Sequence, residues 1–232
     1  MKRRLVLFDI DGTILLSGGA GRRAITAALS EAVGDFDAFS GIRFDGKTDP
    51  QIVGELLAAA GHGRPHDEAH VAALCERYVT LLEQELAGGR SGTVVMPGVP
   101  ELLDRLEAEK SVVLGLLTGN LARGARLKLS AAGISPDRFR VGAYGSDSAH
   151  RPDLPAVAAA RAEPLFGRVP EREEVVIIGD TPADIHCGSG IGARALGVAT
   201  GGYGIEELAS CGPHAVFADL SDTAAVLAAI LE

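Results

Sequence analysis

Cysteine is scarce in this sequence, and basic side chains are outnumbered by acidic ones. The three cysteines, Cys75, Cys187 and Cys211, are odd in number and widely separated, which argues against a disulfide framework and favours a reducing compartment. Lysine and arginine together number 22 against 31 aspartates and glutamates, which gives a net charge of −9 and a pI near 5.2. This acidic balance argues against a nucleic-acid backbone or an anionic membrane as partner.

Long apolar runs are also missing. No stretch approaches the roughly 20 residues that a transmembrane helix needs. Lys2, Arg3 and Arg4 resemble the start of a signal peptide, but the apolar stretch after them stops at Asp9, short of the roughly 7–15 residues that a signal requires. We therefore expect a cytoplasmic protein, monomeric or homodimeric, whose partner is a small molecule and neither a membrane nor a nucleic acid.

The sequence does contain enough apolar material for a large core. Hydrophobic residues make up 47% of the 232 residues, and the mean hydropathy is +0.19, which is typical of a globular chain with one large domain or two modest ones. Short apolar runs at residues 5–8, 111–117 and 175–178 are typical of buried parallel strands. Weaker strand patterns occur at residues 140–144, 194–198 and 215–217, and helical patterns lie between the strands. This alternation predicts an α/β fold with a doubly wound parallel sheet.

Residues 16–95 interrupt the alternation. They show no convincing strand pattern, whereas apolar residues recur there at helical spacing in several stretches. Glycine-rich segments at Gly18-Gly19 and at residues 88–92 enclose this region and are candidate hinges. We therefore predict an α/β core made of residues 1–15 and 96–232, and an inserted helical cap domain at residues 16–95.

Small and polar residues follow each of the three clearest strands. Asp9 and Asp11 come after the first strand, Thr118-Gly119-Asn120 follows the second, and Asp180 and Asp184 follow the third. In an open parallel sheet, ligands bind beyond the carboxyl ends of the strands, which meet at one edge. Carboxylate oxygens at that edge suit a hard cation such as Mg²⁺, and an ionised aspartate is also a competent nucleophile toward phosphorus. Taken alone, the first of these motifs could equally be a polar turn after a strand.

The three strand ends together resemble the motifs of the haloacid dehalogenase superfamily, in its phosphatase branch, among the phosphoglycolate phosphatase-like members with a helical cap. The resemblance covers nearly the whole chain and implies a Rossmann-like core. It also implies that Asp9 attacks phosphorus, and that Asp11 protonates the leaving oxygen and then takes a proton from the attacking water.

The resemblance implies a metal site and a phosphate site as well. Mg²⁺ would be held by the side chains of Asp9 and Asp180 and by the backbone carbonyl of Asp11. Asp184 would support the ion directly or through a water molecule. The phosphoryl oxygens would be bound at the end of the second strand, by Thr118 and by the amides of Gly119 and Asn120.

Two further residues are candidates on weaker grounds. Arg151, in His150-Arg151-Pro152, stands where the superfamily usually has a catalytic lysine in its third motif, so the motif keeps a cation but changes its shape. Lys47 lies in a stretch that resembles a substrate-facing loop of the cap. It either meets a distal anionic group of the substrate or is a solvated residue in a turn.

The sequence therefore predicts a Mg²⁺-dependent phosphatase that hydrolyses a small phosphomonoester, phosphoglycolate-like or a sugar phosphate, through an aspartyl-phosphate. Asp11 favours an oxygen leaving group, because members that cleave carbon–halogen or carbon–phosphorus bonds characteristically lack this aspartate. A sugar phosphomutase of the same superfamily is the alternative enzyme, since it could use the same two aspartates but would return phosphate to the substrate. A catalytically silent binding module would be expected to lack Asp9, Asp11 or Asp180, and all three are present.

Overall fold

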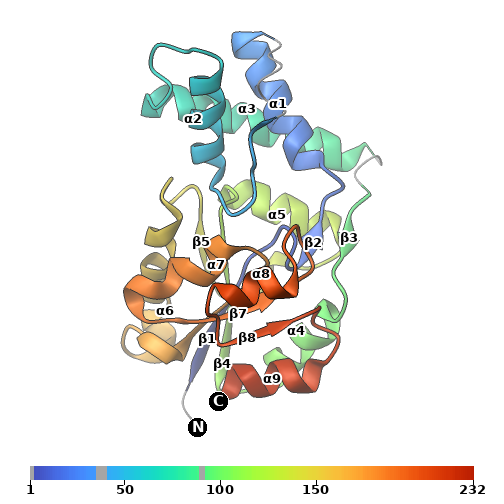
Figure 1. Ribbon diagram of the computed structural model, residues 1–232, viewed down its shortest axis with the longest axis vertical. Helices are drawn as coiled ribbons and strands as arrows, with labels where there is room; N and C mark the ends of the chain where they lie inside the picture. The colour runs from blue at the N-terminus through green and yellow to red at the C-terminus, as the bar shows by residue number, and fades with distance from the viewer. Residues whose placement is uncertain (1–2, 35–40, 89–91) are drawn as a thin grey trace.

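The computed structural model describes residues 3–34, 41–88 and 92–232 (Figure 1). Its core is a sheet of six parallel strands in the order β5-β4-β1-β6-β7-β8. The strands lie where the apolar patterns predicted them, which confirms the α/β fold. Their bounds are β1 (Arg4–Phe8), β4 (Val112–Thr118), β5 (Val141–Tyr144), β6 (Val175–Gly179), β7 (Arg194–Val198) and β8 (Ala215–Phe217).

The central strand β1 explains why helices cover both faces of the sheet. Val6 and Phe8 belong to one apolar cluster, whereas Leu5 and Leu7 belong to another on the opposite face, and all four side chains are fully buried. The first cluster includes side chains of α4 (Val99–Ala108), α5 (Ala122–Ala131) and α9 (Thr223–Leu231). The second includes side chains of α6 (Leu154–Phe166) and α7 (Pro182–Cys187). The sheet is therefore doubly wound, as predicted.

Shorter elements complete the core. Helix α8 (Ile205–Ser210) packs beside β7 and β8 through Leu208, which is fully buried. Helix α8 was not predicted from the sequence, because six residues are too few to show a helical apolar pattern. Short 3-10 helices also occur in the described part of the chain, at η2 (Pro136–Arg138), η3 (Arg151–Asp153), η4 (Arg172–Glu174) and η5 (Gly188–Ile191).

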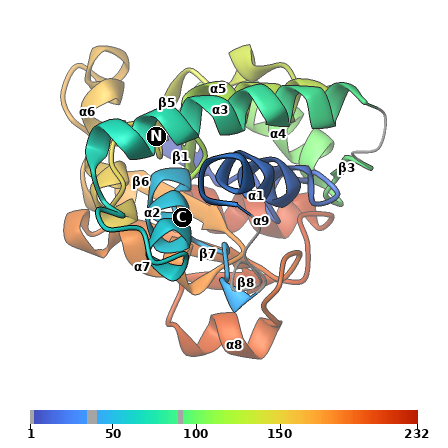
Figure 2. The same ribbon diagram turned by 90° about the horizontal axis from the view of Figure 1, so that it is seen from above.

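A helical region lies beyond the carboxyl ends of the strands (Figures 1 and 2). It contains α1 (Ala20–Val33), α2 (Asp49–Ala59) and α3 (Glu68–Ala87), and α1 and α3 lie side by side. These helices share an apolar cluster of their own, with Ile25, Leu56 and Tyr78 at 2% exposure or less. The predicted inserted helical region is thereby confirmed. None of the helices in the described residues combines the length and the apolar character needed to cross a bilayer.

Two short antiparallel strands, β2 (Leu15–Leu16) and β3 (Val94–Val95), connect the helical region with the core. Each has only two residues, which is too short to give a period-2 pattern in the sequence. The predicted hinge at Gly18-Gly19 directly precedes α1, and both glycines have a positive φ. The other predicted hinge, at residues 88–92, lies mostly outside the described residues. The division into residues 1–15, 16–95 and 96–232 stays a prediction.

Candidate active site

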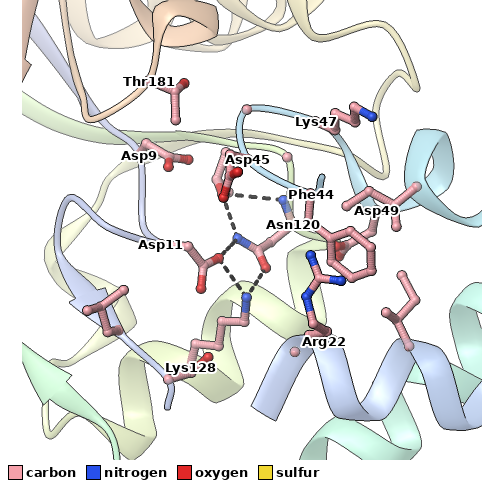
Figure 3. Close-up of a pocket in the computed structure, with 18 of the residues that line it drawn as sticks. Asp9, Asp11, Arg22, Phe44, Asp45, Lys47, Asp49, Asn120, Lys128 and Thr181 are labelled. Atoms are coloured by element: carbon pink, nitrogen blue, oxygen red, sulfur yellow. Dashed lines mark hydrogen bonds and ion pairs between the residues drawn. The ribbon is translucent and has the colours of Figure 1, made fainter. Parts of the chain in front are cut away.

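The three strand ends that carry the polar motifs meet at one edge of the sheet. Strand β1 lies between β4 and β6, so that Phe8 is opposite both Leu116 and Ile178. The residues just beyond these positions line a pocket of about 360 Å³ between the sheet edge and the helical region (Figure 3). Because the helical region covers this edge, the pocket draws its lining from both parts of the molecule.

Three carboxylates form a buried cluster, and two of them, Asp9 and Asp180, line the pocket. One oxygen of each of Asp9, Asp180 and Asp184 lies within 4.8 Å of the others, and the residues are only 6%, 4% and 1% exposed. Burial raises the pKa of Asp9 and of Asp180, and repulsion from neighbouring carboxylates adds to both shifts, although Arg151 opposes the shift at Asp9. The three carboxylates are hard oxygen donors that repel one another. They are suited to bind a divalent cation, which would offset this repulsion.

Local sequence holds these carboxylates in place. Gly12 has φ +86°, and a Cβ there would lie 2.3 Å from an Asp180 oxygen, so the turn after β1 requires glycine. Thr13 donates a hydrogen bond from Oγ1 to Asp180 Oδ1 at 3.0 Å. Asp184 lies at the start of α7 and accepts hydrogen bonds from the backbone amide and hydroxyl of Thr181, at 3.0 and 2.6 Å, in a capping box.

Arg151 supplies the cation beside this cluster. The residue begins η3 and is 5% exposed; its Nη2 lies 3.1 Å from Asp9 Oδ1 and also contacts Asp184. Burial opposes the charged form, but the carboxylates of Asp184 and Asp9 outweigh it and raise the pKa of Arg151. Its Nε is buried without a hydrogen-bond partner among the described residues. The sequence-based candidate is therefore next to Asp9, although its chemical role is untested.

The Asp11 carboxylate turns away from the acidic cluster and toward the loop after β4. Asp11 Oδ2 accepts hydrogen bonds from Asn120 Nδ2 at 2.7 Å and from Lys128 Nζ at 2.6 Å (Figure 3). Asn120 also donates to Thr118 Oγ1 at 2.8 Å and accepts from Lys128 at 2.6 Å. Asp11 is therefore hydrogen-bonded to the loop that the sequence predicts to bind phosphate.

The helical region contacts the same loop through the start of α2. The backbone amide of Asp49 donates to Gly119 O at 2.8 Å, and its Oδ2 accepts from the amide of Leu121 at 2.8 Å. A Cβ at Gly119 would lie 2.0 Å from the backbone oxygen of Lys47, so only glycine permits this approach. Thr48 adds a hydrogen bond from Oγ1 to Ala149 O at 2.7 Å. Burial raises the pKa of Asp49 to about 6, and Lys128 opposes that shift.

Other charged side chains line the pocket on the side of the helical region. Lys47 forms an ion pair with Glu55 on α2, at 2.5 Å, and both side chains are about one-third exposed or less. Arg22 on α1 lies over the ring of Phe44, with 3.9 Å between its guanidinium carbon and the ring centroid. Lys47 is paired with a carboxylate of the protein, Glu55, so its contact with the substrate stays a prediction.

Sequence reasoning missed two residues of this pocket as site residues. In the sequence, Asp49 has the signature of a helix start, and Lys128 and Arg123 are only fallback positions for the cation if Arg151 is not beside Asp9. Lys128 lies ten residues after Thr118 on α5, with apolar residues on either side, so nothing local in the sequence indicates that it contacts Asp11. Arg123 forms an exposed ion pair with Glu83.

Comparison with known proteins identifies the family. Among solved structures, the fold is similar to a hydrolase from Pseudomonas syringae, with 22% identity, a TM-score of 0.72 and 98% of both chains covered. It is also similar to a predicted phosphoglycolate phosphatase from Haemophilus somnus 129PT, with 21% identity, a TM-score of 0.70 and 98% and 99% coverage. CbbY from Rhodobacter sphaeroides, solved in complex with phosphate, has 17% identity and a TM-score of 0.72 over 95% of this chain and 96% of that one.

These identities establish a common fold, and no curated protein matches the sequence. Residues 3–192, which include the three strand ends with polar motifs, match the sequence profile of the haloacid dehalogenase-like hydrolases. The chain therefore belongs to the haloacid dehalogenase-like hydrolase family.

Proposed function

We propose that the protein is a Mg²⁺-dependent phosphatase that hydrolyses a small phosphomonoester through a phosphorylated Asp9. The observation that carries this proposal is the position of the Asp9 carboxylate. It lies at the base of the pocket between a buried guanidinium, at 3.1 Å, and two further buried carboxylates. A nucleophile that attacks an anionic phosphoryl group needs positive charge nearby. Arg151 supplies one such charge, and a cation bound by the carboxylates would supply another.

In the first step, an Asp9 oxygen attacks phosphorus and the bond to the leaving oxygen breaks. Asp11 donates a proton to that oxygen, so the leaving group departs as an alcohol. Arg151, Thr118 and the amides after Thr118 bind the phosphoryl oxygens during the transfer. The carboxylates of Asp9 and Asp180 and the backbone carbonyl of Asp11 would hold Mg²⁺, with Asp184 supporting it directly or through water. The ion would supply positive charge next to the phosphoryl group.

In the second step, Asp11 takes a proton from a water molecule, which attacks phosphorus. The bond between phosphorus and the Asp9 oxygen breaks, inorganic phosphate is released and Asp9 is again a carboxylate. The hydrogen bonds of Asp49 to Gly119 and Leu121 keep the helical region over the pocket during this cycle, which limits the entry of bulk water.

The pocket supports a substrate of metabolite size. A volume of about 360 Å³ is near the lower end of small-molecule sites and leaves room for a phosphoryl group with a short leaving group, either phosphoglycolate-like or a sugar. Lys47 and Arg22 line the side of the helical region, where a polar or anionic leaving group would lie.

A panel of phosphorylated metabolites with Mg²⁺, scored by released inorganic phosphate, tests this function. We expect turnover of at least one small phosphomonoester. Transfer of phosphate to a second sugar hydroxyl without release would instead identify a phosphomutase. An absence of both reactions across the panel, with phosphorylated Asp9 undetected, would overturn the proposal.

A further inference from the structure

We propose that Lys128 is a positioning residue for Asp11: together with Asn120 it holds one oxygen of the carboxylate, so that the other oxygen carries the catalytic proton. This inference rests on the proposed function. It assigns a role to a residue that lies outside the sequence motifs from which that function was predicted. Lys128 acts through Asp11 and does not itself exchange a proton with the substrate.

The contacts of Asp11 with described side chains are all made by a single oxygen. Oδ2 accepts from the Lys128 ammonium at 2.6 Å and from the Asn120 amide at 2.7 Å (Figure 3), whereas Oδ1 accepts no hydrogen bond from the described side chains. Lys128 also donates to Asn120 Oδ1 at 2.6 Å, so the three side chains form a closed triangle. Such a triangle fixes the rotation of the Asp11 carboxylate about its last side-chain bond.

Two donors on Oδ2 decide where the proton can be. A proton on Oδ2 would meet the hydrogen atoms of an ammonium and of an amide, and it would displace a charge-assisted hydrogen bond. Oδ1 is the oxygen that can be protonated without losing these contacts. The Asp11 side chain is 40% exposed and lines the pocket, so its other oxygen is accessible to a leaving group or to water.

The surroundings of Lys128 also favour an ionic role over simple packing. Its side chain is only 5% exposed, and a lysine is rarely so buried unless it is paired. Asp11 is its ionic partner among the described residues, and the buried Asp49 carboxylate lies near enough to interact with it. If Lys128 only held α5 against the sheet edge, its replacement would have the same effect whether or not Asp11 transferred a proton. The experiments below separate these two roles.

The first experiment compares two leaving groups. Lys128→Met keeps the length and apolar stem of the side chain but removes its donors. We expect it to lower kcat by about 10–100-fold on the best alkyl phosphomonoester of the panel, because misaligned general acid catalysis loses part of its usual contribution of roughly 10²–10⁴. The loss on p-nitrophenyl phosphate should be severalfold smaller, since nitrophenolate leaves without a proton. Lys110→Met, at an exposed turn before β4, is the matched control and should leave both rates unchanged.

The second experiment repeats Lys128→Met in an Asp11→Asn background. If Lys128 acts through Asp11, the second substitution should change the residual rate less than twofold. Lys128→Arg should recover part of the wild-type rate on the alkyl ester, because it restores a cation with a different shape. If Lys128→Met does not fold, as judged by thermal melting, Lys128→Gln takes its place in both comparisons.

The outcomes distinguish this inference from the function on which it rests. Wild-type protein that releases no phosphate from any ester overturns the proposed function, and the role of Lys128 with it. Wild-type turnover combined with equal losses on both leaving groups overturns the inference alone. Equal losses in the wild-type and Asp11→Asn backgrounds do the same, since they assign Lys128 a structural role.

Discussion

The sheet edge and the loop of the helical region face the same pocket but differ in how their charges are arranged. At the sheet edge, charged groups are buried and paired across elements distant in sequence, as Arg151 is with Asp9. In the helical region, Lys47 pairs with a carboxylate eight residues away on the helix that follows it. The start of α2 differs, because Asp49 forms hydrogen bonds to residues 119 and 121 of the core and Thr48 forms one to residue 149. The comparison suggests that the core holds the reacting groups, while the helical region acts on them through a few contacts.

Removal of the proposed metal ion should have the largest effect on activity, because the whole acidic cluster that would bind it belongs to the core. EDTA should abolish phosphate release, Mg²⁺ should restore it, and Ca²⁺ should restore it poorly because it favours more ligands at longer distances. Asp180→Asn should also abolish release. In metal-free buffer, however, its melting temperature should exceed that of the wild type, because one of three buried, mutually repelling carboxylates is gone. Full activity after exhaustive chelation would contradict the metal role of the cluster.

Replacing the cation of the sheet edge should have the next largest effect. Arg151→Ala should lower kcat by about 10²–10³, because a donor to the transition state is lost and Asp9 and Asp184 lose their paired charge. Arg151→Lys should recover part of the loss, since charge is retained without the planar fork. Arg140→Ala, at an exposed position before β5, is the matched control for both steady-state kinetics and thermal melting. A near-normal kcat in Arg151→Ala would mean that another cation balances the charge of Asp9 during the reaction.

Cutting the link between the two regions should have a smaller effect. Asp49→Ala leaves the buried Leu121 amide without an acceptor, which costs about 1–3 kcal/mol, and it should lower kcat/KM about tenfold on every substrate. Asp49→Asn keeps an acceptor oxygen and should retain most of the activity. A loss confined to one substrate would mean that Asp49 contacts the leaving group and does not position the loop.

The pH dependence of stability provides a second test of Asp49. Its pKa in the folded protein is raised to about 6 from 3.8, so the folded state binds a proton more tightly than the unfolded state. The corresponding stability is fully present below about pH 4 and is lost as the pH rises through 6. The melting temperature of Asp49→Asn should therefore rise relative to wild type between pH 4 and 7. A constant difference over that range would contradict the burial of this carboxylate.

Within the helical region, the smallest expected effect is on selectivity. Lys47→Ala should lower kcat/KM for the preferred metabolite severalfold more than for p-nitrophenyl phosphate, if Lys47 meets a distal group of the substrate. Glu55→Gln is the control, because it removes the carboxylate that pairs with Lys47 and leaves Lys47 in place. Equal changes on both substrates would leave Lys47 as a structural ion pair at the pocket wall.

The contrast between the sheet edge and the helical region also explains which features could be predicted from the sequence. Runs such as residues 175–178 are apolar on both faces, so buried parallel strands and the residues at their ends followed from the pattern alone. The meeting of Asp9, Thr118 and Asp180 then followed from the geometry of a parallel sheet. Arg151 could be proposed because a motif offered a position for it, although no local pattern shows that it contacts Asp9.

Contacts between side chains distant in the sequence could not be predicted in this way. The hydrogen bond from Leu121 to Asp49 joins residues 72 positions apart, and Lys128 reaches Asp11 across 117 positions. Neither contact leaves a periodic signal, because each depends on how the helical region and α5 pack over the sheet edge. Asp49 in particular has the sequence signature of a helix start, since Thr48 caps α2 and Pro50 lies in its first turn.

The most direct test of the central claim is to look for the phosphorylated aspartate itself. Wild-type protein is mixed with its best substrate and Mg²⁺, quenched in acid during turnover, and digested for mass spectrometry. We expect a phosphoryl group on Asp9 in the wild type and none in Asp9→Asn, which should also release no phosphate. Phosphate release by Asp9→Asn at the wild-type rate, with deamidation excluded by mass, would contradict the assignment of Asp9 as the nucleophile.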